Sequence, residues 1–328
     1  MFLSIRLLLA KLLLCCELEI RQRTAVSENL FRAACSSFGQ HLKNVMNGNS
    51  LGDSSAVSIP GRVLPQHHTA VTLLGAMIAA HPEAPFDWLD LASGRGQIIA
   101  HLEDTLPDPA LRGKIRYLGY DINNDYARET EWLASQLKFA QSRVITGELG
   151  HFSRICKPDE TFSFISFTNV VHELPPVLFG ELFLQLILRL KPDGMLYIYD
   201  MELLPDPELG AVPWDAADVR RLLMFIFKEL GAKAAAPMVQ RWPHATCTAW
   251  SVQLDRKKLD VDTQSITNGF ETKQARTAAF ITDLFREKLQ RTIELLEELT
   301  LHGGQTGEEQ KKKTKLLYDF WSLSRLQL

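Results

Sequence analysis

Between residues 82 and 256, short runs of β-branched and aromatic residues alternate with longer stretches of helical periodicity. The short runs lie at residues 86–91, 115–122, 143–148, 162–169 and 195–201, and the helical stretches lie at residues 97–106, 125–137 and 177–190. Strands that alternate with helices are typical of βαβ units, in which a helix connects two parallel strands. The pattern therefore predicts an α/β fold built on a parallel sheet.

The sequence after the fifth run predicts how the sheet ends. Residues 215–231, DAADVRRLLMFIFKELG, have the pattern of a helix that stops at Gly231. Segments around Val239 and at 249–254 are expected to form a closing antiparallel hairpin. We therefore expect a three-layer sandwich with a mostly parallel, seven-stranded sheet and an antiparallel closing strand.

Both flanks of this region are predicted to be helical. In the leucine-rich first twenty residues, Lys11, Glu17 and Glu19 break the apolar run, which predicts an amphipathic helix docked on the protein or on a partner. A membrane-associated helix and a start codon assigned too early are the alternatives. Residues 47–61 have the composition of a linker or an ordered cap. Apolar residues repeat every three or four positions from 281 to 299, which predicts a helix of about 30 residues followed by a second helix.

These patterns divide the chain into a helical N-terminal arm, linker and lid (1–81), a core (82–257) and a C-terminal helical hairpin (258–328). The 46% hydrophobic composition is enough for a buried core. With 36 Lys and Arg against 39 Asp and Glu, the net charge is −3, so no global basic field attracts nucleic acid. The five cysteines form no CxxC pair, which argues against a zinc site and favours a reducing, cytoplasmic location.

A glycine-containing turn joins the first predicted strand to the following helix. Small residues in such a turn let the backbone approach a ligand, and the free N–H groups at the start of the helix bind anionic or polar groups. A single G-x-G is weak evidence, and its place between a strand and a helix is what strengthens it. The candidate ligand-binding residues are Asp90, Ala92, Ser93, Gly94, Gly96 and Gln97.

The turn does not fit a dinucleotide fingerprint, because Ile99 occupies the position of its third glycine. The sequence D-L-A-S-G-R-G resembles motif I of the class I S-adenosylmethionine-dependent methyltransferases, with Ala92 in place of the first glycine. The resemblance covers about half of the chain. It implies a Rossmann-like fold, S-adenosylmethionine (SAM) as cofactor and S-adenosylhomocysteine (SAH) as product, with the methionine part over the turn.

Two further acidic residues follow predicted strands. Asp121 ends the second strand, where nucleotide-binding α/β folds place a carboxylate that accepts hydrogen bonds from ribose. The resemblance implies that Glu148 at the end of the third strand binds the adenine amino group, and that Ile122 and Leu149 flank the ring. The alternative is that Asp121 and Glu148 are solvated residues beside a loop.

The fourth predicted strand ends in Thr168-Asn169-Val170-Val171-His172-Glu173, at the edge where such sheets bind ligands. It lacks the two prolines and the aromatic residue of the N/D-P-P-Y/F turn of amino methyltransferases of nucleic-acid bases, but it resembles the N-x-x-H turn of many small-molecule members. We therefore expect Thr168 and Asn169 beside the cofactor, and Asn169, His172 and Glu173 beside the methyl acceptor. His172 is either a general base or a residue at the rim, and Glu173 either orients it or starts the next loop.

Several other polar and aromatic residues are weaker candidates. His67 and His68 are interpreted as part of a lid over the substrate, and the alternative is that they are ordinary polar residues at the start of a helix. The remaining candidates are expected to be structural or to lie at the edge of a pocket: His151, Tyr197, Trp242, His244 and Trp250. The basic run at residues 311–315 is expected to be a solvated helix face.

We therefore interpret the sequence as that of a methyltransferase acting on an O or N atom of a small molecule or a protein, without a metal. A non-catalytic SAM-binding scaffold that recruits a partner through its helical ends is one alternative, and an RNA- or DNA-directed enzyme is the other. Oligomerisation through the terminal helices is a further expectation, as is the absence of a transmembrane segment.

Overall fold

The computed structural model describes residues 65–157, 159–204, 208, 210–232, 239–243, 248–302 and 306–325. The predicted N-terminal helix, the segment 47–61 and His244 lie outside the described residues. The chain forms two compact units, one made of Asp53–Pro205 and Val212–Phe285, and one that includes Arg286–Leu328. The predicted domain boundaries at 81/82 and 257/258 stay a prediction.

The first unit contains one seven-stranded sheet. Its strands are β1 (Phe86–Leu91), β2 (Ile115–Asp121), β3 (Gln141–Thr146), β4 (Phe162–Thr168), β5 (Leu190–Leu203), β6 (Val239–Pro243) and β7 (Thr248–Asp255). They are arranged in the order β3-β2-β1-β4-β5-β7-β6. The pairs among β1 to β5 are parallel, and β7 is antiparallel to both of its neighbours. The predicted α/β, Rossmann-like sheet is confirmed.

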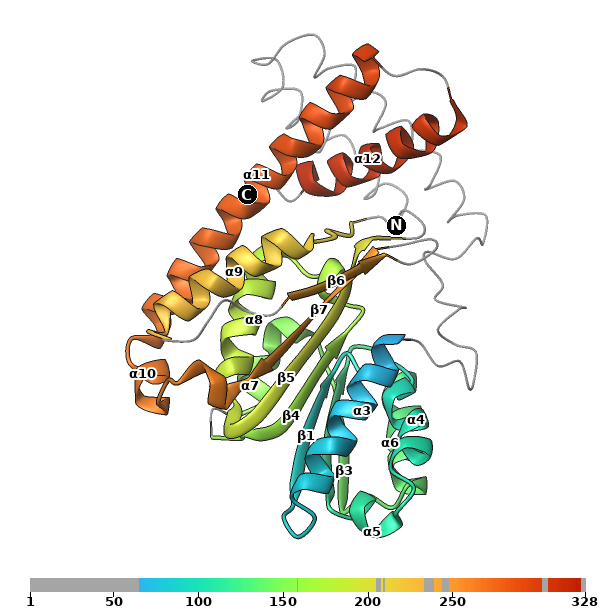
Figure 1. Cartoon of the computed structure of the whole chain (residues 1–328), viewed down its shortest axis with the longest axis vertical. Coiled ribbons are helices and arrows are strands. Elements are labelled where there is room, and N and C mark those ends of the chain that lie inside the picture. Colours follow the sequence, from blue (N-terminus) through green and yellow to red (C-terminus); the bar gives the residue numbers. More distant parts are fainter. Residues whose placement is uncertain are drawn as a thin grey trace, which may run out of the picture. The chain divides into compact units, whose positions relative to one another are not determined.

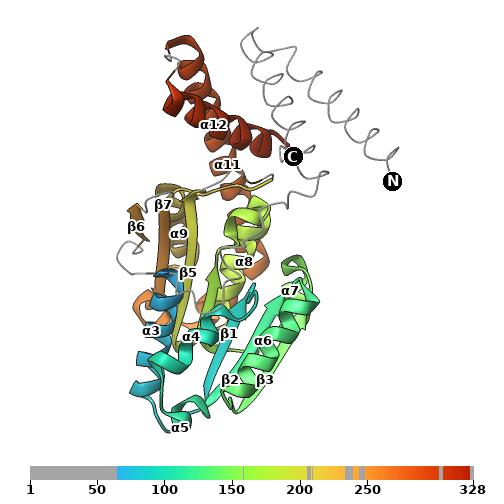
Figure 2. The same ribbon diagram turned by 90° about the vertical axis from the view of Figure 1, so that its right-hand side faces the viewer.

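Helices cover both faces of the sheet, which gives three layers (Figures 1 and 2). Helices α3, α4 and α6 lie on one face, and α8 and α9 lie on the other. The α-helices are α3 (Pro65–Ala80), α4 (Gln97–Thr105), α5 (Pro109–Arg112), α6 (Asn124–Gln136), α7 (Phe152–Ile155), α8 (Pro176–Leu188), α9 (Ala216–Glu229), α10 (Thr263–Thr267), α11 (Phe270–His302) and α12 (Gly307–Arg325). Three short 3₁₀ turns complete the set: η1 (Leu149–His151), η2 (Val171–Glu173) and η3 (Arg256–Leu259).

Local sequence signals set the starts of the main helices. Asn123 caps α6 because its side-chain oxygen accepts the backbone N–H of Asp125 at 2.9 Å. Asp215 caps α9 in the same way, accepting the N–H of Asp218 at 2.8 Å. Proline at the first position of α8 lacks an N–H that would have no partner inside the helix. The predicted helices therefore form close to their expected positions.

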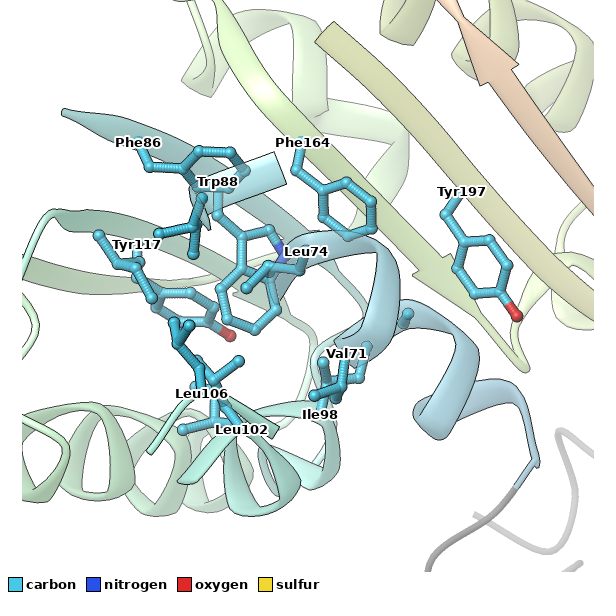
Figure 3. Close-up of a cluster of buried hydrophobic side chains, with 14 of the residues drawn as sticks. Val71, Leu74, Phe86, Trp88, Ile98, Leu102, Leu106, Tyr117, Phe164 and Tyr197 are labelled. Carbon is cyan, nitrogen blue, oxygen red and sulfur yellow. The ribbon is translucent and has the colours of Figure 1, made fainter. Parts of the chain in front are cut away.

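A large apolar cluster fixes the first strand against the helices that precede and follow it (Figure 3). Trp88 of β1 lies in its centre, with Leu74 of α3 and Leu102 of α4 on the helix side. The Tyr117 ring meets the Trp88 ring edge-on, with centroids 4.8 Å apart. Burial of each such side chain is worth about 1.5–3 kcal/mol, so the end of β1 is held on a rigid base.

Strands β3 and β5 differ from their predicted bounds by two or more residues at each end. Strand β3 runs over Gln141–Thr146 rather than 143–148, because its pairing with β2 extends from Gln141 to Thr146. Strand β5 begins at Leu190, before the expected turn, because Leu190 already pairs with Phe162 across a register shift. Both predicted C-terminal helices are present, as α11 and α12. Within the described ranges, no helix combines the length and the apolar character that a membrane crossing needs.

Candidate functional site at the carboxyl edge of the sheet

The turn after β1 has a strained backbone. Ala92, Gly94 and Gly96 all have positive φ angles, of 52°, 54° and 74°. This left-handed conformation suits glycine and costs a residue with a Cβ atom roughly 1–2 kcal/mol, so Ala92 carries strain at the position of the missing first glycine. At Gly96 a Cβ atom would lie only 3.0 Å from Leu133 Cδ1. The close approach of α6, together with the positive φ angle, therefore favours glycine there.

Asp121, at the end of β2, holds this turn. Its Oδ2 accepts the N–H of Gly94 at 2.8 Å, and its Oδ1 accepts the N–H of Asn123 at 2.8 Å. The carbonyl oxygen of Gly94 accepts the Thr130 hydroxyl at 2.8 Å. Burial raises the pKa of Asp121 despite these hydrogen bonds. The structure thus brings Asp121 and the glycine turn together, and it shows that Asp121 organises the turn as well as facing it.

Asp90 lies beneath the turn, in a buried polar network that the sequence analysis did not find. The Ser166 hydroxyl donates to Asp90 Oδ1 at 2.6 Å, and the Tyr117 hydroxyl donates to Oδ2 at 3.1 Å. Trp88 Nε1 in turn donates to Ser166 Oγ at 2.8 Å. Burial raises the pKa of Asp90 to about 7, against the effect of the two hydroxyl donors. The alternation of Ser166 with apolar residues in β4 is the signal that a buried polar partner was present.

The predicted adenine-side residues flank Asp121 but differ in exposure. The Ile122 side chain is 68% exposed, which leaves an apolar surface next to Asp121. Glu148 precedes η1 and has an exposed side chain, and its backbone oxygen accepts the Tyr120 hydroxyl at 2.8 Å. Leu149 is half-buried in the same turn. Their contact with adenine stays a prediction.

The end of β4 carries a second strained residue. Thr168 is the last residue of the strand, and Asn169 follows it with a φ angle of 58°. The N–H of Asn169 donates to the Tyr199 carbonyl at 2.9 Å, which ties the turn to β5. Its side-chain Oδ1 is buried and has no hydrogen-bond partner among the described residues. A buried amide oxygen of this kind is an unused acceptor for a ligand donor.

His172 is buried in η2, next to an acidic residue that sequence reasoning missed. Its Nδ1 lies 2.6 Å from Oδ1 of Asp200 in β5, and its Nε2 lies 3.9 Å from Oε1 of Glu173. Asp200 is 1% exposed, whereas the Glu173 side chain is 61% exposed. A carboxylate directly after the apolar run LYIY of β5, at the same edge as Asn169, was the available signal.

The weaker candidates lie elsewhere. His67 and His68 are within α3: His68 is exposed, and burial, with the charge of His101, lowers the pKa of His67 to about 4. Tyr197 and Trp250 are fully buried core residues, and the Trp250 indole N–H donates to the Trp214 carbonyl at 2.7 Å. Among the others, His151 is exposed at the end of η1, Trp242 is in β6, and Lys311, Lys312, Lys313 and Lys315 are in α12.

Solved methyltransferase structures resemble the chain at low sequence identity. Magnesium protoporphyrin IX methyltransferase from Synechocystis PCC 6803, with bound SAH, is 15% identical (65% of this chain, 99% of that one, TM-score 0.43). A plantazolicin methyltransferase in complex with a pentazolic desmethylPZN analog and SAH is 15% identical (70% and 98%, TM-score 0.44). An rRNA methylase from Streptococcus thermophilus is 13% identical (60% and 98%, TM-score 0.40).

No protein-family model matches the sequence. No curated protein matches it either. At identities of 13–15%, these similarities concern the fold, and any argument about activity must come from the chain's own residues.

Proposed function

We propose that the protein is a SAM-dependent methyltransferase that transfers a methyl group to an oxygen or nitrogen atom of a small molecule or a protein. The observation that carries this proposal is the strained turn Ala92 to Gly96, tied through Gly94 to Asp121 at the carboxyl edge of a parallel sheet. Left-handed strain in a turn of small residues is typical of a backbone that is shaped for close contact with a ligand.

The residues at this edge suit the parts of the cofactor. Four of the five residues of the turn are small, and the exception, Arg95, has its guanidinium group against Glu129 and the Tyr126 ring, so the methionine part can lie against the backbone of the turn and the start of α4. Asp121 is oriented by two backbone N–H groups and keeps lone pairs for the ribose hydroxyls. The exposed apolar surface of Ile122 is available to one face of adenine. Glu148 would accept from the adenine amino group after a rotation of its exposed side chain.

When bound, SAM supplies a methyl group on a positively charged sulfur, which leaves as a neutral thioether. The task of the protein is then to align an acceptor with that methyl group, because alignment accounts for much of the rate of a displacement reaction. Asn169 and His172, which follow β4 next to the turn after β1, are the residues proposed to face the acceptor. Asn169 Oδ1 would accept a hydrogen bond from the O–H or N–H group of the molecule to be methylated. His172 Nε2 would take the proton that this group loses as its oxygen or nitrogen lone pair bonds to the methyl carbon.

The test of this proposal measures cofactor binding by calorimetry, with SAM and SAH as separate ligands. We expect wild type to bind both, and we expect Asp121→Ala to weaken binding by about 10- to 100-fold, because hydrogen bonds to a charged group contribute about 1.5–3 kcal/mol. Asp125→Ala is the matched control, since Asp125 lies four residues later with a side chain that is 83% exposed. Wild type that binds neither ligand would overturn the proposal.

Turnover distinguishes the enzyme from a scaffold. Incubation with SAM carrying a labelled methyl group, followed by mass spectrometry of metabolites and protein digests, should show label on an O or N atom. Binding of SAM without any labelled product would favour the non-catalytic reading. Label found in RNA or DNA instead would overturn the acceptor class proposed here.

A further inference from the structure

Three hydrogen bonds hold His172, one at its imidazole ring and two at its backbone. Asp200 Oδ1 lies 2.6 Å from His172 Nδ1, and Oδ2 accepts the backbone N–H of His172 at 2.8 Å. On the other side, the carbonyl oxygen of His172 accepts the N–H of Val212 at 2.6 Å. The Asp200 carboxylate therefore holds both the backbone N–H and the ring of His172, and the segment before α9 holds the His172 carbonyl group.

The Asp200–His172 pair is buried, and the groups around Asp200 favour one protonation state of its carboxyl group. The His172 and Asp200 side chains are 3% and 1% exposed, so their hydrogen bonds meet little competition from water. Asp200 Oδ1 also accepts the backbone N–H of Met201 at 2.6 Å. Two of the three groups around the carboxylate are backbone N–H groups, which can only donate. The surroundings therefore select the acceptor form of Asp200, an ionised carboxylate.

An ionised Asp200 determines which nitrogen of His172 carries the proton. A carboxylate without a proton can only accept, so Nδ1 must donate to it. In a neutral imidazole the other nitrogen, Nε2, then has the lone pair. Glu173 Oε1 is 3.9 Å from Nε2 and belongs to an exposed side chain, whereas Asp200 is buried and in direct contact. The orienting carboxylate is thus Asp200, not the neighbouring residue in the sequence.

We propose that Asp200 is the positioning residue of this site, which keeps His172 in the Nδ1–H tautomer so that Nε2 is the nitrogen that accepts a proton. Its catalytic consequence rests on the proposed function: as the acceptor's lone pair bonds to the methyl carbon and the carbon–sulfur bond electrons pass to sulfur, the acceptor's proton moves to Nε2. Asp200 itself touches neither substrate nor cofactor in this scheme. It acts through the orientation and tautomer of His172.

The experiment reads the tautomer directly, without a known methyl acceptor. Protein labelled with ¹⁵N at histidine is studied by NMR from about pH 6 to about pH 10, so that the neutral ring is observed. The signals of His172 are those missing from His172→Gln. In wild type we expect a single neutral form with Nδ1 protonated and Nε2 unprotonated. A wild-type neutral ring protonated at Nε2 overturns the proposal without any variant of Asp200.

Variants of Asp200 then test whether that residue sets the tautomer. Asp200→Leu removes every acceptor, so we expect the two nitrogen shifts of His172 to converge toward the average of exchanging tautomers. Asp200→Asn keeps one acceptor oxygen, so a smaller move in the same direction is expected. Glu202→Gln is the matched control: Glu202 lies on the same strand but accepts from Arg241 and the Ala216 N–H, so the His172 signals should not change. Unchanged signals in Asp200→Leu would assign Asp200 a purely structural role.

Cofactor calorimetry keeps this result separate from the proposed function. Among the described residues, the hydrogen bonds of Asp200 are to His172 and Met201, not to the glycine turn or Asp121, so we expect folded Asp200→Asn to bind SAH as wild type does. If wild type has the expected tautomer but binds no cofactor, the proposed methyltransferase function is refuted, whereas the proposed role of Asp200 in fixing the His172 tautomer is supported. Once an acceptor is identified, loss of the tautomer should reduce kcat about 10²-fold or more with little change in the cofactor KM.

Discussion

Substitution of Asp90 by asparagine is expected to remove a pH dependence from the stability of the protein. Asp90 is 2% exposed, and its burial raises its pKa from 3.8 to about 7. A carboxyl group with a raised pKa in the folded state binds its proton more tightly there than in the unfolded chain. Its contribution to stability is fully present below about pH 4 and is lost as the pH rises through about 7.

The magnitude follows from the two pKa values. A rise from 3.8 to about 7 corresponds to about 4 kcal/mol in total, of which about 3 kcal/mol is lost between about pH 5 and about pH 8. An asparagine has no proton to lose in this range. Its amide can keep both contacts, because the Ser166 and Tyr117 hydroxyls can accept as well as donate. We therefore expect Asp90→Asn to gain about 3 kcal/mol on wild type as the pH rises.

The assay is urea unfolding followed by tryptophan fluorescence, without cofactor, at several values from about pH 5 to about pH 8. The quantity of interest is the difference in unfolding free energy between variant and wild type, in which contributions of other groups cancel. Asp87→Asn is the control on the same strand. Burial tends to raise the pKa of Asp87, but hydrogen bonds from Arg116 and Lys191 outweigh this effect and hold the pKa below its usual value. Asp87 is then ionised throughout the range, and its difference should be flat. Parallel profiles for wild type and Asp90→Asn would refute the reasoning.

Three further predictions concern backbone strain, burial of a titratable group and packing. Ala92→Gly should stabilise the protein by about 1 kcal/mol in urea unfolding, because Ala92 has a φ angle of 52°, whereas Ala100→Gly on the exposed face of α4 should cost about 1 kcal/mol. Burial lowers the pKa of His67 to about 4, so its neutral form contributes stability above about pH 6.5 that is lost as the pH falls, and His67→Gln should flatten the melting temperature between about pH 6.5 and about pH 4. Gly180→Val should destabilise the protein by about 1–3 kcal/mol in the same urea assay, because even a Cβ atom would lie 3.2 Å from Ile281 Cγ2; equal stability would contradict close packing of α8 on α11.

The sequence was sufficient for the fold because its local signals and its apolar pattern agree. Strand β1 was predicted with its observed bounds, since a short apolar run ends there at a glycine turn. The boundary of β3 was missed because pairing with β2 already begins at Gln141, a polar residue outside the apolar run. Pairing between strands decides such boundaries, and a single strand's sequence does not contain it.

The candidate site was predictable only in part. Asp121 and Gly94 were named from separate motifs, and their hydrogen bond could not be known before the sheet placed β1 beside β2. Ser166 and Asp200 carry no motif and act through residues 76 and 28 positions away. Long-range partners of this kind follow from strand order, which local periodicity does not specify.

The charged residues at the two edges of the sheet have different surroundings, and this contrast supports a ligand at the carboxyl edge. At the amino edge, Asp87 is neutralised by Arg116 and Lys191, so the charges there are satisfied within the protein. At the carboxyl edge, burial raises the pKa of both Asp90 and Asp121, and neither forms a salt bridge with another described residue that would balance the cost of burying its charge. Left-handed strain at Ala92 and Asn169 occurs at the same edge. The energetic cost of burying these carboxylates is therefore not compensated within the protein. A binding site for a cationic cofactor would have this property, because the compensating positive charge comes with the ligand.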